Sequence, residues 1–204
     1  MYYLGLKGEK MNNIESLTQE INTCLKCPLG ETRTHAVVGD GNIHSSIMLI
    51  GEGPGFYEDQ QGIPFVGRSG QLLNKILQAC GFTREKDVFI TNIVKCRPPK
   101  NRDPTPQERQ TCLPYLYAQI EYMQPKIIVL LGATALKGLV DSNARITKMR
   151  GQWLDWQGHL VMPTYHPSAL LRNPQLKRPV WDDFKQIVYK YRELVDPNHF
   201  SKYC

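Results

Sequence analysis

The sequence predicts an α/β domain in which helices cover both faces of a central, mainly parallel sheet of about four strands. Short apolar runs rich in β-branched residues alternate with segments whose apolar residues recur at helical spacing. Such alternation favours right-handed crossovers and parallel strands that are buried on both faces. No repeat, low-complexity tract or Gly/Ser linker interrupts the chain. We therefore expect its 204 residues to form one three-layer α/β/α domain.

The expected strands are residues 47–51, 88–94, 126–132 and 160–165, and the expected helices are 13–23, 70–80, 105–123, 133–140 and 181–194. The third helix has the clearest start, because Thr105, Pro106 and Glu108 fit the N-cap, N1 and N3 positions of a capping box. Pro114 lies inside this helix and predicts a kink or a split. The core is expected to run from about residue 12 to 195, with loosely held termini at 1–10 and 196–204.

Composition excludes several classes of protein. Hydrophobic residues make up 41% of the chain and charged residues 22%, which excludes a wholly disordered or fibrous chain. No apolar run approaches the ~20 residues of a membrane span, and residues 1–10 lack the apolar stretch of a signal peptide. We expect a cytoplasmic protein that does not enter a membrane. Nothing in the sequence indicates an obligate oligomer, so we expect a monomer.

The net charge is +6, and the basic residues concentrate in two segments, 95–102 and 170–179, that contain no acidic residue. A basic segment fits a polyanionic partner such as nucleic acid. A solvated basic face explains the same pattern equally well. Charge alone therefore does not decide between them.

Four of the six cysteines have the spacing of a metal site. Cys24 and Cys27 form a C-x2-C pair, and Cys96 and Cys112 are separated by 15 residues. A C-x2-C turn directs two thiolates at one centre, and two further thiolates would complete a four-sulfur site. Zinc and an iron–sulfur cluster both fit, and spacing alone does not choose between them. Cys80 lies on the apolar face of the 70–80 helix and is expected to be a core thiol.

Polar residues follow three of the predicted strands. Glu52 comes after the first strand, Asn92 lies at the end of the second, and His166 follows the fourth. Ligands of open α/β sheets bind at the carboxyl ends of the strands, so these side chains are expected to converge in an active site. Each has a plainer interpretation, since a buried amide or a lone histidine is often structural. Phe65, held in a Gly/Pro-bounded loop, fits either a core residue or a platform for stacking.

Four motifs in order along the chain carry a resemblance to a known family. They are residues 24–34 (CLKCPLGETRT), 51–67 (GEGPGFYEDQQGIPFVG), 91–99 (TNIVKCRPP) and 166–172 (HPSALLR). The sequence resembles the family 4 uracil-DNA glycosylases, the iron–sulfur branch of that superfamily, from about Cys24 to Leu194. The resemblance implies an enzyme of base excision repair. Such an enzyme flips uracil out of single- or double-stranded DNA and hydrolyses its N-glycosidic bond, leaving an abasic site.

The resemblance also implies roles for individual residues. It makes Glu52 and His166 catalytic, with His166 stabilising charge on uracil O2. It implies a [4Fe–4S] cluster on Cys24, Cys27, Cys96 and Cys112. The uracil pocket would contain Gly53, Glu58, Phe65 as the stacking ring, Asn92 as the reader of the O4/N3 edge, and His166. The DNA-binding loop would contain Ser168, Leu170, Leu171 and Arg172, with Leu170 or Leu171 as the wedge that fills the gap left by the base.

Two departures from the best-known branch of the superfamily leave roles open. Gly53 stands where that branch has its water-activating aspartate, and Gly55 stands where it has the tyrosine that excludes thymine. Glu52 and Glu58 are the acidic candidates for these tasks. Two alternatives also remain. One is a protein that traps the abasic product covalently through the histidine loop, although the basic insertion of that branch is lacking. The other is a non-catalytic, metal-bearing module that binds nucleic acid.

Overall fold

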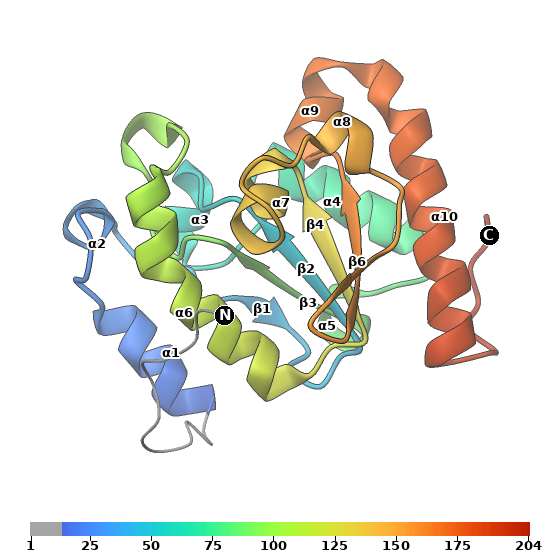
Figure 1. The fold of residues 1–204 in the computed structure, drawn as a ribbon, viewed down its shortest axis with the longest axis horizontal. Coiled ribbons are helices and arrows are strands. Elements are labelled where there is room, and N and C mark those ends of the chain that lie inside the picture. The colour runs from blue at the N-terminus through green and yellow to red at the C-terminus, as the bar shows by residue number, and fades with distance from the viewer. Residues whose placement is uncertain (1–13) are drawn as a thin grey trace.

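In a computed structural model, which describes residues 14–204, a six-stranded mixed sheet lies between two layers of helices (Figure 1). The strand order is β1-β3-β2-β4-β6-β5. The four inner strands are parallel, and the edge strands β1 and β5 pair antiparallel with β3 and β6. The predicted three-layer class is confirmed, and the four predicted strands are the inner four. The two edge strands were missed because runs of two and three residues are too short to show a period.

The strands are β1 Asp40–Gly41, β2 Ile47–Gly51, β3 Val88–Asn92, β4 Ile127–Leu131, β5 Leu154–Trp156 and β6 His159–Thr164. The longer helices are α1 Ile14–Thr23, α4 Arg68–Ala79, α6 Pro106–Met123, α7 Ala133–Leu139 and α10 Lys177–Leu194. The short ones are α2 Leu29–Thr32, α3 Phe56–Gln61, α5 Arg84–Asp87, α8 Ile146–Met149, α9 Pro167–Arg172 and the 3-10 turns η1 Pro99–Asn101 and η2 Pro174–Leu176. Among the helices of residues 14–204, none is long and apolar enough to cross a membrane.

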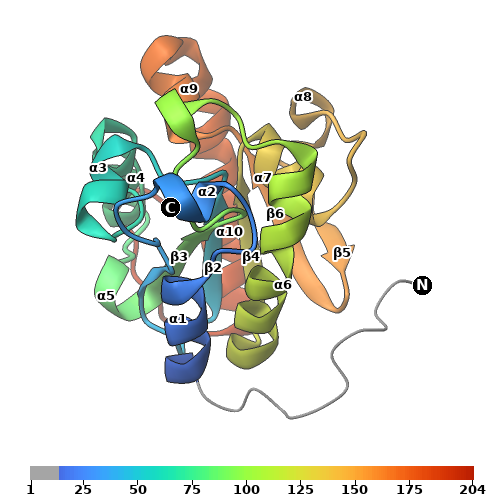
Figure 2. The same cartoon turned by 90° about the vertical axis from the view of Figure 1, so that its left-hand side faces the viewer.

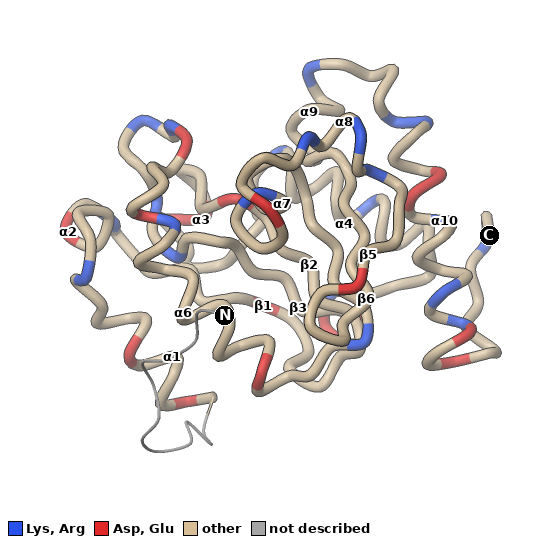
Figure 3. Tube along the Cα trace, in the orientation of Figure 1, with Lys and Arg blue, Asp and Glu red and all other residues tan. Residues whose placement is uncertain are grey.

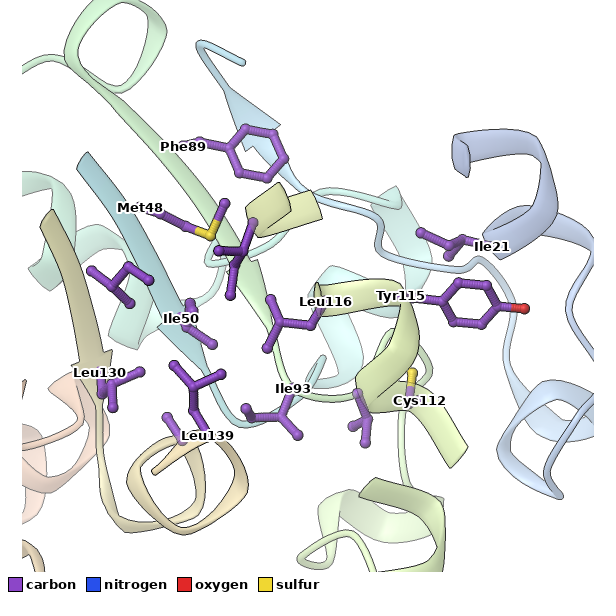
Figure 4. Close-up of a cluster of buried hydrophobic side chains, with 14 of the residues drawn as sticks. Ile21, Met48, Ile50, Phe89, Ile93, Cys112, Tyr115, Leu116, Leu130 and Leu139 are labelled. Atoms are coloured by element: carbon purple, nitrogen blue, oxygen red, sulfur yellow. The ribbon is translucent and has the colours of Figure 1, made fainter. Parts of the chain in front are cut away.

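The sheet separates two apolar cores, as the alternation of side chains along a strand requires. In β2, Met48 and Ile50 face α1, α6 and α7, whereas Ile47 and Leu49 face α4, α9 and α10. Figure 4 shows the first core, a cluster of buried side chains that includes Ile50 of β2, Leu130 of β4 and Leu116 of α6. Every residue of the four parallel strands except the first two of β6 is buried. This burial is typical of a parallel sheet that is covered on both faces.

Helix α6 starts as the sequence predicts but does not split. The Thr105 hydroxyl accepts a hydrogen bond from the Glu108 amide at 3.2 Å, and the Glu108 carboxylate accepts one from the Thr105 amide at 2.7 Å. Arg102 also binds this carboxylate and, as the largest cause, lowers the Glu108 pKa to about 2. Of the kink or split predicted at Pro114, the split was wrong, because α6 continues for 18 residues. Buried side chains on both sides of the proline anchor the helix to the core.

The two ends of the chain were both expected to be loose. Residues 1–10 lie outside the described residues. The expectation was wrong for the C-terminal segment 196–204, which packs against the rest of the domain. Ser201 is buried and its hydroxyl donates to the Ala79 carbonyl at 3.1 Å, while His199 hydrogen-bonds the Cys80 carbonyl at 2.8 Å. These contacts add the last residues to the second core.

The capping box gives a stability prediction. Thr105→Ala removes the acceptor for the Glu108 amide, so it should lower the free energy of unfolding by about 1 kcal/mol. Thr23→Ala is the control, since that exposed hydroxyl bonds a carbonyl within its own helix and caps no amide. Urea denaturation followed by far-UV circular dichroism measures both. Equal losses in the two variants would contradict the capping role.

Candidate active site and cysteine cluster

A cavity of about 210 Å³ opens at the carboxyl ends of β2, β3 and β6. The predicted residues that line it are Glu52, Gly53, Glu58, Phe65, Asn92, His166 and Ser168. A second cavity of about 460 Å³ lies beside it and shares Glu52, Gly53 and His166 with it. The structure therefore brings the expected carboxylate, ring, amide and imidazole to one place. Residues of the 98–102 segment complete the wall, which the sequence did not indicate.

Gly51, the last residue of β2, creates the space for two of these side chains. A Cβ built on Gly51 would lie 2.4 Å from Asn92 Oδ1 and 2.7 Å from the Phe65 ring. Asn92 is 1% exposed, and its Oδ1 has no hydrogen-bond partner within the described residues. A buried acceptor without a donor is costly, so it indicates a group that a ligand supplies. Gly51 was not predicted as a site residue, because a strand-ending glycine has no chemistry of its own.

Phe65 is held in a left-handed backbone conformation, with φ at +55°, that non-glycine residues rarely adopt. The buried Glu58 carboxylate accepts hydrogen bonds from the amides of Val66 at 3.0 Å and Gly67 at 2.9 Å. These two bonds fix the chain just after Phe65. A carboxylate predicted to shape the pocket thus also fixes the loop that presents the aromatic ring.

The same loop is held from its other side by α4 and Arg84. Gly70 lies against the loop so closely that a Cβ on it would stand 1.8 Å from the Phe65 carbonyl oxygen. Arg84 donates to that carbonyl at 3.1 Å and also to the carbonyl of Pro64. Because contacts on both sides determine the conformation, the unfavourable φ of Phe65 persists. Arg84 was missed, since its only sequence signal is a surface charge in a polar segment.

His166 is a neutral imidazole in this site. Its Nδ1 accepts a hydrogen bond from the Ser168 amide at 3.1 Å and lies 2.8 Å from the Ser168 hydroxyl. An Nδ1 that accepts leaves the ring proton on Nε2. Burial, with a smaller contribution from the charge of Arg172, lowers the pKa of His166 to about 4. The ring lies 5.5 Å from Phe65, centroid to centroid, so both form one wall of the cavity.

Glu52 is partly buried, and burial raises the pKa of its carboxyl above the ordinary value. The Thr134 hydroxyl, at the start of α7, donates a hydrogen bond to Glu52 Oε2 and opposes part of this shift. The bond fixes the carboxylate at the border of the two cavities. Thr134 was not among the predicted residues. Its position just after β4, at the same edge of the sheet, was the available signal.

The segment after His166, which forms helix α9, corrects the expectation that either Leu170 or Leu171 could act as the wedge. Leu170 is 1% exposed and packs in the second core, so it cannot enter DNA from this conformation. Leu171 is 40% exposed, and Arg172 lines the second cavity. The Ser168 hydroxyl, which was expected to contact DNA, forms a hydrogen bond with His166 Nδ1. Within the predicted pair of leucines, only Leu171 is placed to act as a wedge.

The four predicted cysteines line one small cavity between α1, α6 and the end of β3. No disulfide involves any of the six cysteines. Three N–H groups point at sulfur atoms: Arg33 at Cys96, 3.0 Å, the Lys95 amide at Cys112, 3.3 Å, and the Lys26 amide at Cys24, 3.5 Å. Gly30 lines the same cavity, and a Cβ on it would stand 2.7 Å from the Cys24 carbonyl.

The chemistry of these donors fits a metal centre. Burial raises the pKa of the Cys112 thiol to about 11 and that of Cys96 above its ordinary value, so a bound cation is needed to hold them as thiolates. Yet within residues 14–204 no group of three or more His, Cys, Asp or Glu side chains is arranged to hold a single metal ion. The N–H donors are the type that stabilises charge on cluster-bound sulfur.

Lys95 corrects a second expectation. It begins the basic 95–102 segment, which was expected to face solvent or a polyanionic partner, but it is 1% exposed. Its ammonium donates to Thr91 Oγ1 at 2.6 Å, Gln119 Oε1 at 2.7 Å and the Asn92 carbonyl at 2.8 Å. Burial lowers the Lys95 pKa to about 8. The basic residues around Lys95 in the sequence did not indicate that its side chain is buried.

Comparisons with known proteins find a matching family and several similar sequences. The sequence model of a family described as the uracil DNA glycosylase superfamily matches residues 38–185. Several curated relatives carry the name type-4 uracil-DNA glycosylase, among them the following three. The Thermotoga maritima protein is 50% identical over 85% of this chain and 92% of its own length. The relative from Sulfurisphaera tokodaii is 43% identical over 94% of this chain and 89% of its own length. The relative from Saccharolobus solfataricus is 44% identical over 87% of this chain and 86% of its own length.

The half-buried imidazole of His166 gives a pH prediction. His166 should titrate near pH 4 in the folded protein, as followed by NMR of ¹⁵N-labelled histidine side chains. Since the unfolded chain takes up this proton near pH 6.5, the stability linked to His166 is complete above that pH and is lost as the pH falls toward 4. Arg172→Gln should raise the pKa slightly. A midpoint near 6.5 in the wild type would contradict a buried, neutral ring.

Proposed function

The chain belongs to the uracil-DNA glycosylase superfamily and is a DNA-repair enzyme that removes uracil, and from this premise we propose how its residues perform the reaction. A uracil flipped out of DNA would occupy the 210 Å³ cavity. The bond between base and sugar is then hydrolysed, which leaves an abasic site. One observation carries this assignment: the buried, unpartnered Asn92 Oδ1 in the same cavity as the His166 ring.

Asn92 would select the base. Uracil offers a donor at N3 and an acceptor at O4, so the Asn92 amide can accept from N3–H at Oδ1 and donate to O4. Cytosine presents an acceptor at N3 and an amino donor at the neighbouring position, so both contacts would fail. Phe65 would stack on the ring face, which offsets part of the few kcal/mol needed to unstack the base. The Glu58 and Arg84 contacts keep that ring in place before the substrate arrives.

Glu58 is our candidate for the exclusion of thymine. Its Oε2 lies 2.8 Å from where a Cβ on Gly55 would stand, so the carboxylate fills the space that a larger residue at 55 would occupy. Thymine differs from uracil by one methyl group, and a filled wall rejects a methyl by shape. A fixed position is needed for such a rejection, and the two amides bonded to Glu58 supply it.

His166 and Glu52 would act on the reacting bond. Cleavage leaves negative charge on the uracil and positive charge on the sugar. The Nε2–H of a neutral His166 is a suitable donor to O2, where negative charge develops, and such a preorganised donor is worth about 3–4 kcal/mol. The Glu52 carboxylate, held by Thr134, would position water beside the sugar. Attack by this water delivers a hydroxyl to the sugar carbon while its proton is lost to solvent or to Glu52.

DNA would be held by the basic segments around the cavity. Lys and Arg side chains recur in the segment before α6 and around α9 and the start of α10 (Figure 3). These charges suit the phosphates on either side of the flipped nucleotide. Leu171 would fill the gap that the base leaves, with Arg172 next to it. We expect the protein to act as a monomer in the cytoplasm, where its DNA substrate would be.

We also propose that Cys24, Cys27, Cys96 and Cys112 hold a [4Fe–4S] cluster. The naming of the relatives as type-4 enzymes is consistent with it, and two observations support it: the four cysteines line one cavity, and three N–H groups donate to their sulfur atoms. When bound, the cluster cross-links α1 and the residues after it to β3 and α6. Its role is structural, because it would fix the chain that runs from Asn92 to the basic segment.

The enzymatic proposal is tested with oligonucleotides. A single uracil in a labelled strand should yield an alkali-labile site, whereas thymine or cytosine at that position should not. His166→Ala should lower kcat by roughly a hundred- to a thousandfold with little change in DNA binding. His44→Ala, which changes an exposed histidine, should behave like the wild type. An uncut uracil strand, or equal losses of binding and turnover in His166→Ala, would contradict the mechanism.

The same reaction separates the two alternatives. If the protein traps its product, a denaturing gel will show a protein–DNA band that depends on His166. If it only binds nucleic acid, neither cleavage nor this band will appear.

The cluster has its own test. Protein purified without oxygen should contain about four iron atoms and four acid-labile sulfides per chain. Cys27→Ser should lose most of the iron and open the α1–α6 contact to proteolysis. Cys204→Ser should keep the iron, since Cys204 lies outside the set. Zinc without sulfide would overturn the assignment.

A further inference from the structure

Two adjacent aromatic side chains lie in solvent at the start of α3. Phe56 is 48% exposed and Tyr57 is 59% exposed. Their ring centroids are 5.4 Å apart at an interplanar angle of 80°, so they form an edge-to-face pair. Exposed rings side by side are unusual unless something covers them, because aromatic surface gains much from burial. The mechanism described above uses neither ring.

The Phe56–Tyr57 pair stands directly between two residues of the uracil cavity. Gly55 and Glu58, which flank the pair in sequence, both line that cavity. Of the large apolar side chains exposed in residues 14–204, Leu171 lies on α9, the helix that also carries the cavity residue Ser168. Exposed apolar side chains therefore occur on two of the segments that line the cavity.

Contacts on both sides hold the pair in place. The Arg97 guanidinium lies 5.0 Å from the centre of the Phe56 ring, and its Nε donates to Asn101 of the cavity wall at 2.7 Å. The Tyr57 ring lies 3.6 Å from the position of a Cβ on Gly67, next to the loop that presents Phe65. Figures 1 and 2 show α3 beside the segment that leads to α6. The rings thus bridge the two walls of the mouth.

The positive charge of Arg97 is available to bind an anionic partner. It forms no ion pair within the part of the chain from residue 14 to 204, and its neighbours Lys100 and Arg102 are exposed. Arg102 is engaged by Glu108, whereas no ion pair of the described residues neutralises Arg97. An aromatic pair with a free cation beside it matches the repeating chemistry of a nucleic acid strand, which alternates a flat base with a phosphate. Protein partners offer no such repeat.

We propose that the Phe56–Tyr57 pair is a binding site for the nucleobase next to the flipped uracil, with Arg97 on the phosphate between the two nucleotides. This inference rests on the proposed function, because it assumes that uracil fills the neighbouring cavity. Stacking on an aromatic ring reads no sequence and requires a base whose face is free. The enzyme therefore binds uracil in single-stranded or locally opened DNA with help from a second, sequence-independent contact.

The test uses single-stranded oligonucleotides with three kinds of neighbour to the uracil. One set has normal bases on both sides, and two sets carry a baseless tetrahydrofuran residue on the 5′ or the 3′ side. Phe56→Ala and Tyr57→Ala should each raise KM about tenfold on normal substrate, while kcat stays near that of the wild type. On one of the two baseless substrates, wild type and variants should have the same KM. Tyr57→Phe should keep the wild-type KM, and Tyr189→Ala, at a similarly exposed position on α10, serves as the control.

A second readout does not depend on turnover. With 2-aminopurine beside the uracil, binding to the wild type should quench fluorescence, and binding to the Phe56→Ala/Tyr57→Ala variant should quench less. Equal KM defects on all three substrates, or unchanged quenching, would overturn the stacking site. A change in oligomeric state with an unchanged KM would show that the pair contacts a second copy instead. If the wild-type protein leaves uracil uncut but still quenches the 2-aminopurine, and the double variant quenches less, the glycosylase function fails. The pair would then be a stacking site for bases of DNA, without the link to a flipped uracil.

Discussion

The missing side chain of Gly51 is the constraint on which the whole site depends. Asn92 Oδ1 and the Phe65 ring share the volume that a Cβ at residue 51 would fill. One comes from the strand next to β2, and the other from a loop that returns over the strand end. Their approach makes a cavity with an amide edge on one side and a ring on the other. A parallel sheet makes such convergence possible, since its strands end at one edge.

Around this point, each reactive group is held by another that takes no part in the chemistry. Glu58 and Arg84 hold the backbone around Phe65, Ser168 sets the tautomer of His166, and Thr134 fixes Glu52. Preorganisation of this kind is what lets a site stabilise a charge without first rearranging. The costs are visible as a left-handed Phe65 and an unsatisfied Asn92 oxygen. The structure tolerates the left-handed backbone of Phe65 and the unpaired oxygen of Asn92 because hydrogen bonds from neighbouring residues hold both segments in place.

The cysteine cluster and the active site are neighbours through one strand end. Lys95 donates from its side chain to the Asn92 carbonyl and from its backbone to Cys112. Whatever holds the cysteines therefore also holds the turn that presents Asn92. Beyond that turn the chain reaches Arg97 and the walls of the cavity mouth. A structural cluster in this position would set the geometry of base recognition and of the DNA surface together.

The sequence alone determined the layer order, the four inner strands, the capping box of α6 and the convergence of Glu52, Asn92 and His166 at one edge of the sheet. Those features follow from local patterns, such as strand periodicity, N-cap chemistry and the residue that ends each strand. Gly53, Glu58 and Ser168 were expected at the site only because the motifs resemble those of a known family. Tertiary structure decided the rest. Lys95 and Leu170 turn inward, Pro114 leaves α6 in one piece, and Gly51, Arg84 and Thr134 acquire roles. The reason is physical: a side chain's direction and partners depend on packing between segments far apart in the chain, which no local pattern contains.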